Sequence, residues 1–252
     1  MRAATRLALF GVGLVAVFAA AAAAANALAP DDAATAWTQT GEDDTMRDHP
    51  NANPSHPPSG FSLEQRGYVL DTVTAPERTG QRGELSFHIL GPKGDVVTDF
   101  DADHEKDLHL IVVRTDGAQF RHVHPTRDES GTWTIPWEWD AAGSYRVYAD
   151  FRANGDHGPL PVTLSHTVQV AGEYTPIEPD PASTATVAGF EVTVTGELEV
   201  GSLSQLTLSV SRQGEAVTTL EPYLGALGHL VALRAGDLGY LHMHPEGHAP
   251  GT

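Results

Sequence analysis

The sequence predicts an all-β protein built from two tandem antiparallel β-sandwiches, and three observations support this prediction. From residue 61 onward, short apolar runs with strand-like alternation follow one another, turn residues separate them, and no helical period is seen. The same order of strands and turns returns about 120 residues later. A series of short antiparallel strands is typical of a sandwich. The chain is therefore predicted to contain this domain twice.

The first element, residues 1–29, is predicted to be an export segment. Arg2 and Arg6 precede an apolar run of nineteen residues, from Leu7 to Ala25, and small residues follow it. These are the parts of a signal peptide, but an apolar run of this length also suits a membrane-spanning helix. Cleaved signal and uncleaved anchor both remain open. Either one places the rest of the chain outside the cytoplasm, secreted or attached to the membrane through this segment alone, in agreement with the positive-inside rule.

The overall composition excludes several kinds of partner and ligand. The 252 residues carry a formal net charge of -18, from 33 acidic and 15 basic residues. Such a surface repels nucleic acid and anionic lipid and attracts cations. There are 13 histidines and no cysteine, which excludes disulfides and thiolate metal sites. A bound metal ion would have to be held by imidazole, carboxylate or the occasional methionine.

Two proline-rich stretches are predicted to lie outside the folded domains. Residues 30–60 contain acidic pairs and the run His49–Pro58, and this composition predicts a disordered spacer. Residues 173–186 contain three prolines at close spacing and are predicted to be a stiff linker between the two domains.

The first domain is predicted at residues 61–172. Its most distinctive part is a β-hairpin in which residues 108–114 and 119–124 flank an Asp-Gly turn. Farther on, the run Ala142–Val147 resembles the start of strand F in immunoglobulin-like domains, where a tyrosine fixes the corner. Val147 stands where antibody domains have a cysteine. The domain is therefore predicted to be an immunoglobulin-like sandwich without the disulfide.

The second domain, residues 187–252, repeats the pattern of the first up to Pro245 and then stops. Nothing after that residue matches residues 132–170, which supply the last three strands of the first domain. A sandwich without these strands leaves sheet edges and an apolar face open. We therefore expect that the chain is a fragment or that another chain completes the second domain, and that this domain is the less ordered of the two.

A pattern of three histidines occurs once in each repeat. The second histidine follows the first by thirteen residues, and the third follows the second by two. A pattern that recurs at the same spacing indicates common ancestry and nominates one site per repeat. The histidines are His109, His122 and His124 in the first repeat and His229, His242 and His244 in the second.

The predicted hairpin brings the three histidines of a repeat to one face. With Asp116 and Gly117 at the centre of the turn, His109 stands opposite His124, and residue 111 stands opposite His122. Opposed residues share a face of the sheet, and so do residues two apart on one strand. Three imidazoles gathered in this way suit copper or zinc and leave a position for a fourth ligand. The histidines of both repeats are therefore predicted to be metal ligands, with binding that weakens below about pH 6.

A structural interpretation of the histidines also remains open. His-x-His at a strand end can satisfy loop carbonyls, and Ile111, Val113 and Phe120 are expected on the same face as the histidines. Buried, hydrogen-bonded histidines would then belong to an adhesion or scaffold module that binds no metal. The loop that leads into His109 could supply a carboxylate or His104 as a further ligand. No nucleophile paired with a base, phosphate loop or pair of spaced acids is found, and the protein is predicted not to be an enzyme.

Several of these runs resemble those of a known group of proteins. The resemblance rests on Leu108–Arg114 with the following His122-Val-His-Pro125, and on Tyr223–Leu233 with Tyr240–Pro245. These runs resemble exported or membrane-anchored bacterial proteins of actinobacterial type with tandem immunoglobulin-like (YtkA-like) domains. The resemblance implies an extracytoplasmic location and heavy-metal or copper handling. The predicted partners are a metal ion and a metal-transport protein of the envelope. Members of that group usually continue through the closing strands, where this chain departs from them.

Overall fold

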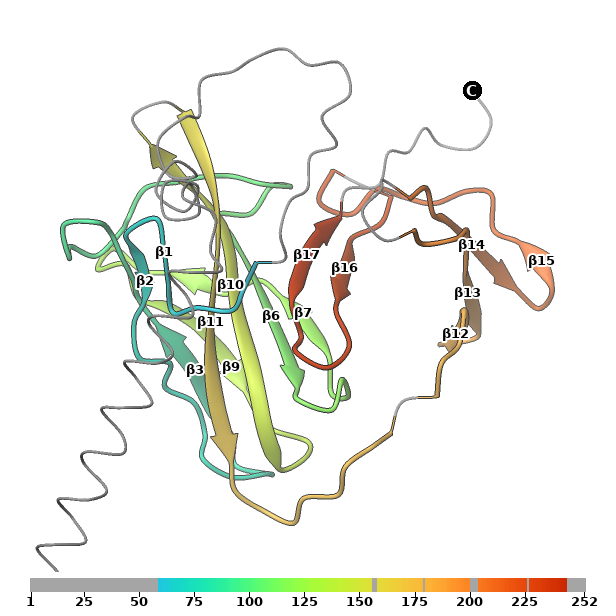
Figure 1. Cartoon of the computed structure of the whole chain (residues 1–252), viewed down its shortest axis with the longest axis horizontal. Helices are drawn as coiled ribbons and strands as arrows, with labels where there is room; N and C mark the ends of the chain where they lie inside the picture. Colours follow the sequence, from blue (N-terminus) through green and yellow to red (C-terminus); the bar gives the residue numbers. More distant parts are fainter. Residues whose placement is uncertain (1–58, 156–157, 179, 200–203, 226, 244–252) are drawn as a thin grey trace, which may run out of the picture. The chain divides into compact units, whose positions relative to one another are not determined.

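The computed structural model describes residues 59–155, 158–178, 180–199, 204–225 and 227–243 (Figure 1). These residues belong to one compact unit, Asn53–Thr252. The predicted export segment at residues 1–29 and nearly all of the predicted spacer at residues 30–60 lie outside the described residues, so both stay predictions. Within the described ranges, no helix has the length and apolar character needed to cross a membrane.

The described part of the chain is all-β, with several antiparallel sheets and no helix, which confirms the all-β part of the prediction. The first repeat contains β1 (Glu64–Gln65), β2 (Tyr68–Leu70), β3 (Gly83–Phe87), β4 (Ile89–Leu90), β5 (Phe100–Asp101), β6 (Leu108–Arg114), β7 (Arg121–Val123), β8 (Thr126–Arg127), β9 (Trp133–Trp137), β10 (Gly143–Gly155) and β11 (Gly158–Val170). The second repeat contains β12 (Thr184–Val187), β13 (Phe190–Thr195), β14 (Thr207–Arg212), β15 (Glu215–Ala216), β16 (Leu230–Leu233) and β17 (Tyr240–Met243).

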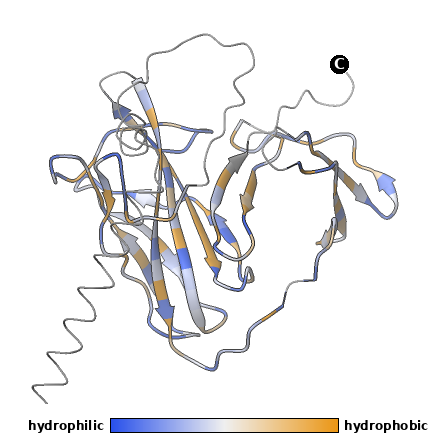
Figure 2. Ribbon diagram, in the orientation of Figure 1, coloured by the Kyte–Doolittle hydropathy of each residue, from blue (hydrophilic) through white to orange (hydrophobic). Residues whose placement is uncertain are grey.

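One hydrophobic core lies inside the first repeat. It collects side chains from three sheets, ordered β1-β2-β4, β3-β9-β8 and β11-β10-β6-β7, with β5 also paired to β10. Alternate residues of β6 enter it, since Leu108, Leu110 and Val112 belong to this core and are at most 1% exposed. Figure 2 shows hydrophobic and hydrophilic stretches along the long strands β10 and β11. The other residues of β6 are buried as well, so this strand is covered on both faces.

Tyr145 on β10 has the environment that the sequence predicts for a corner tyrosine. Its side chain is 2% exposed, and its hydroxyl donates to the backbone carbonyl of Ala141, four residues upstream, at 2.7 Å. Burial is the main cause that raises the pKa of this phenol, so the hydroxyl stays a hydrogen-bond donor. The contact fixes the chain where it enters β10.

The β6–β7 hairpin has the predicted register but not the predicted turn. Ile111 stands opposite His122, as expected. The loop, however, is closed by the Arg114 N–H, which donates to the carbonyl of Ala118 at 2.9 Å. Between this bond and the regular ladder, residues 119 and 120 stand opposite the single residue 113, which is a β-bulge. Gln119 adopts a left-handed φ of 55° there, and the extra residue restores the register that a two-residue turn would give.

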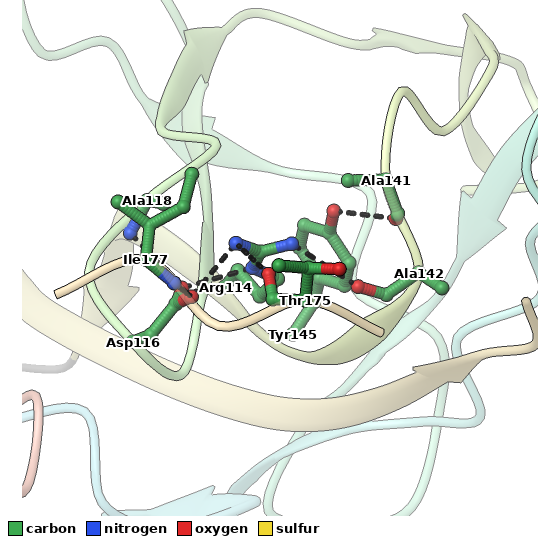
Figure 3. Close-up of polar contacts among 8 residues, drawn as sticks. All are labelled: Arg114, Asp116, Ala118, Ala141, Ala142, Tyr145, Thr175 and Ile177. Atoms are coloured by element: carbon green, nitrogen blue, oxygen red, sulfur yellow. Dashed lines mark hydrogen bonds and ion pairs between the residues drawn. The ribbon is translucent and has the colours of Figure 1, made fainter. Parts of the chain in front are cut away.

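A buried ion pair ties the hairpin turn to the proline-rich segment after the first repeat (Figure 3). Arg114 is 2% exposed, and its guanidinium donates to both carboxylate oxygens of Asp116, at 2.9 and 2.7 Å. It also donates to the backbone carbonyls of Ala142 and Thr175, while Asp116 accepts the N–H of Ile177 at 2.9 Å. Burial raises the pKa of Asp116, but the hydrogen bonds from Arg114 and from backbone N–H groups outweigh it and lower the pKa to about 2.

The second repeat contributes two separate sheets. One has the order β12-β13-β14-β15, and its side chains are exposed or partly exposed; the other is the β16–β17 hairpin. In this hairpin Val231 stands opposite His242, the register that the repeat predicts. The hairpin packs on the first repeat through a second hydrophobic cluster, formed by Ile111, Val113, Tyr148, Leu238 and Tyr240, with Val231 and Leu233 at its edge.

Candidate metal-binding site

Three histidines of the first repeat converge at one end of the β6–β7 hairpin. His109 lies on β6, His122 lies on β7, and His124 follows the end of β7. His109 is 3% exposed, whereas the other two are partly exposed. Since residues of β6 alternate between faces, His109 lies on the face opposite the first-repeat core, the same face as Ile111. These three residues are called the histidine cluster below.

The ring nitrogens of the histidine cluster are close enough to share one ion. His109 Nδ1 lies 3.0 Å from His122 Nε2 and 3.1 Å from His124 Nε2, and one ligand atom from each ring lies within 4.8 Å of the others. Two nitrogens bound to one tetrahedral ion at about 2.0–2.1 Å are separated by about 3.4 Å. The spacing therefore suits a metal ion with only small adjustment of the rings. The sequence prediction that these three imidazoles gather on one side of the hairpin is confirmed.

A backbone carbonyl fixes the orientation of the His109 ring. His109 Nε2 lies 3.0 Å from the carbonyl oxygen of Asp103. A carbonyl only accepts hydrogen bonds, so Nε2 carries the hydrogen in the neutral ring and Nδ1 presents its lone pair to the cluster. Metal-bound histidines are commonly held by such a bond from the second ring nitrogen. The ring of His109 is thus oriented as a ligand before any ion binds.

The ring nitrogens of His122 and His124 both approach the lone pair on His109 Nδ1. His122 Nε2 and His124 Nε2 both lie within 3.1 Å of His109 Nδ1, which can accept only one well-aligned hydrogen bond. A hydrogen bond from one of them therefore leaves the other ring nitrogen beside an occupied acceptor. A cation at the centre, in contrast, interacts favourably with all three lone pairs. The histidine cluster could therefore hold a metal ion.

The electrostatics keep His124 neutral. Burial is the largest cause that lowers its pKa to about 4, and positive charge on His109, His122, Lys106 and His229 acts in the same direction. The neutral ring is the form that binds a metal ion. This ring is therefore available as a ligand well below neutral pH.

The loop between β5 and β6 supplies the carbonyl that His109 uses. The N–H groups of Asp103 and Lys106 each donate to the other residue's carbonyl, at 2.9 and 3.0 Å, and close a tight turn. The two central residues, His104 and Glu105, both adopt left-handed φ angles, of 47° and 62°. Non-glycine residues in this conformation cost free energy and persist where the surroundings hold them. The structure shows a backbone contact from this loop to His109, and a side-chain ligand from the loop stays a prediction.

His229 belongs to the second set of histidines. Among the described side chains of that set, it alone lies beside histidines of the first repeat. Its ring centroid lies 6.4 Å from that of His109, 6.2 Å from that of His122 and 5.3 Å from that of His104. His242 lies on β17 opposite Val231, its side chain is outside the described residues, and so is all of His244. A separate second site at His229, His242 and His244 therefore stays a prediction.

The structure also reveals polar residues near the site that the sequence did not indicate. Asp150 on β10 pairs with His109 in the strand register and is 7% exposed. Its carboxylate accepts hydrogen bonds from Thr163 Oγ1 at 2.8 Å and from the Tyr240 hydroxyl at 2.9 Å. Burial and the nearby Asp150 charge raise the pKa of Tyr240 far above its ordinary range, so its hydroxyl remains a donor. No local sequence signal links these residues, because Asp150 and Tyr240 are ninety positions apart.

A comparison with known protein families gives one match. A family model described as a domain of unknown function (DUF8832) matches residues 64–172 and 185–252. The first matched segment covers the first repeat, and the second covers the sequence of the second repeat. Neither the curated proteins nor the solved structures contain a significant match.

Proposed function

Because the chain belongs to the DUF8832 family, whose description assigns no function, we propose a function from the site itself. The protein is a non-catalytic, extracytoplasmic binder of copper or zinc that uses His109, His122 and His124 as ligands. It buffers the ion or passes it to a metal-transport protein of the envelope. One observation carries this proposal: three ring nitrogens converge while a carbonyl directs the lone pair of His109 toward the other two.

The donor set supports copper or zinc rather than a hard cation. All three donors are imidazole nitrogens, the ligands that copper and zinc share, while calcium and magnesium prefer oxygen. The chain has no cysteine that could provide a competing thiolate site. Its formal net charge of -18 favours accumulation of cations near the surface. Three protein ligands leave a coordination position free for exchange, which suits buffering and transfer.

The finer fold assignment and the location are part of the same proposal. The first repeat is an immunoglobulin-like, YtkA-like sandwich, and its buried Tyr145 with the hydrogen bond to Ala141 supports this assignment. The second repeat is a related domain, residues 187–252. Residues 1–29 direct the chain out of the cytoplasm, as a cleaved signal or a membrane anchor, on the strength of their basic flank and apolar run.

Metal titration of the full chain tests the proposed function. Zn(II) and Cu(II) are titrated separately against a competing chelator, and the dissociation constants are compared among wild type, His122→Gln and His124→Gln. Glutamine keeps an N–H that can donate to His109 Nδ1 but is a poor ligand. We expect binding tighter than about 1 μM in wild type and a loss of about 100-fold or more in each variant, since coordination by neutral imidazole is removed.

A matched control comes from the same repeat. His88 Nε2 contacts Thr132 Oγ1 at 3.0 Å and is not part of the histidine cluster. His88→Gln is expected to bind both ions like wild type. Wild-type binding weaker than about 1 μM, or equal binding by wild type and the two cluster variants, would rule out the proposed site.

The distance between two ring nitrogens of the histidine cluster also supports an alternative function. The 3.0 Å separation between His109 Nδ1 and His122 Nε2 is ordinary for a hydrogen bond. On this alternative the histidines are structural, and the protein is an adhesion or scaffold module. The same titration separates the two functions, because a structural cluster binds neither ion tightly. His122→Ala then lowers thermal stability, and His122→Gln, which retains the donor, does not.

A further inference from the structure

His229 lies beside the histidine cluster although it belongs to the other repeat. We propose that His229 is a fourth ligand, so that a metal ion held by the histidine cluster also clamps the β16–β17 hairpin onto the first repeat. This inference rests on the proposed function and adds to it a regulated contact between repeats. The sequence pattern assigns His229 to a second site, and the structure places its ring beside those of His109 and His122.

The ring of His229 is oriented in the same way as that of His109. His229 Nε2 lies 2.8 Å from the carbonyl oxygen of Tyr223, six residues earlier, just as His109 Nε2 contacts the carbonyl of Asp103, six residues earlier. In both neutral rings the hydrogen must therefore lie on Nε2, and Nδ1 presents the lone pair. The bond that orients a metal-bound histidine is thus present twice, once in each repeat.

The distances place His229 just outside the histidine cluster. Rings within the cluster have centroids 4.9–5.3 Å apart, whereas the ring of His229 lies 6.2 Å from that of His122 and 6.4 Å from that of His109. An approach of about 1 Å brings it to the spacing of the other three, within the range of ordinary loop adjustment on ligand binding. Three histidines leave one position of a tetrahedral ion open, and His229 is placed to take it.

The β16–β17 hairpin is already packed on the strand that carries His109. Leu238 and Tyr240 pack with Ile111 and Tyr148, and the Tyr240 hydroxyl donates to Asp150, which pairs with His109 in the strand register. His229 directly precedes β16. A bond from the ion to His229 would therefore add to contacts that exist without metal, and would tighten the docking rather than create it.

Hydrogen exchange of the full chain, with and without Zn(II), tests this inference. We expect zinc to slow amide exchange in β16 and β17 at least about 10-fold in wild type, but not in His229→Gln. The same variant is expected to bind Zn(II) about 10-fold more weakly, and to retain binding because three ligands remain. Circular dichroism of the metal-free variant establishes that it is folded. Co(II) provides an independent readout, since its visible absorption changes when one nitrogen ligand is replaced by water.

His88→Gln is the matched control, because His88 contacts Thr132 Oγ1 at 3.0 Å and is not part of the histidine cluster. It is expected to keep both the wild-type affinity and the zinc-dependent protection. Wild-type zinc affinity and protection in His229→Gln would overturn the inference and leave the three-histidine site intact. So would a loss seen in His88→Gln but not in His229→Gln. A wild-type chain that binds no Zn(II) would overturn the proposed function and this inference together.

Discussion

Tyr240 of the second repeat donates its hydroxyl hydrogen to the buried carboxylate of Asp150 in the first repeat, at 2.9 Å. The acceptor strand β10 runs beside β6, and Asp150 pairs there with His109. The candidate site and the contact between the repeats therefore share one pair of strands. A substitution that weakens the contact between the repeats is therefore expected to affect the candidate site as well.

Tyr240→Phe is expected to destabilise the contact between the repeats. The substitution keeps the ring that packs on Tyr148 but removes one donor to a carboxylate that is 7% exposed. Loss of a hydrogen bond to a buried charged group costs about 1–3 kcal/mol. Urea denaturation should show this loss, and exchange of the β16–β17 amides should accelerate. Tyr174→Phe, at a ring that is 47% exposed, should change neither quantity; equal stability of the two variants would contradict the role assigned to Asp150.

Gly60→Ala is expected to disrupt the same region by crowding. A Cβ at Gly60 would lie 2.7 Å from Tyr148 Cδ1 and 3.0 Å from Tyr240 Cβ, and Gly60 has a φ of 74°. Overpacking of this kind costs about 1–3 kcal/mol in addition to the strain at positive φ. Gly80→Ala isolates the strain, because Gly80 has a φ of 70° and no atom within 4 Å of its added Cβ. Thermal unfolding should show a larger loss for Gly60→Ala; equal losses would mean that crowding contributes nothing.

Asp116→Asn is expected to change the acid stability of the chain. Because hydrogen bonding lowers the folded-state pKa of Asp116 from 3.8 to about 2, its carboxylate stabilises the fold above about pH 4. That stabilisation disappears as the pH falls from about 4 to about 2, when the folded-state carboxyl also becomes protonated. The asparagine variant should be less stable by about 2 kcal/mol at pH 6. Its deficit relative to wild type should shrink between pH 4 and pH 2 in urea denaturation; a deficit independent of pH would refute this assignment.

His124 is expected to remain neutral at unusually low pH. Burial, together with charge on the neighbouring histidines, lowers its folded-state pKa from 6.5 to about 4. In the unfolded chain the ring is protonated near pH 6.5, so its contribution to stability is present above that pH and is lost as the pH falls toward 4. NMR of the metal-free chain should give this ring a midpoint near 4. A midpoint near 6.5 would show that the ring is not desolvated.

The sequence by itself determined the all-β class, the repeated order of motifs and the meeting of His109, His122 and His124. Side chains alternate with a period of two along a strand, so histidines at fixed positions on a hairpin share a face once the register is set. The register was predictable because it depends on residues close together in the chain. It appears as Ile111 opposite His122 and as Val231 opposite His242.

Only the tertiary structure decided how the histidine cluster is held and what lies beside it. The carbonyl of Asp103 reaches His109 because His104 and Glu105 take left-handed conformations, which sequence patterns do not specify for such residues. The placement of His229 and the bond between Tyr240 and Asp150 join segments far apart in the chain. Contacts of this kind depend on how whole surfaces pack, and no local spacing encodes them. The repeat predicted two equivalent sets of ligands, and packing places His229 of the second set beside the cluster of the first.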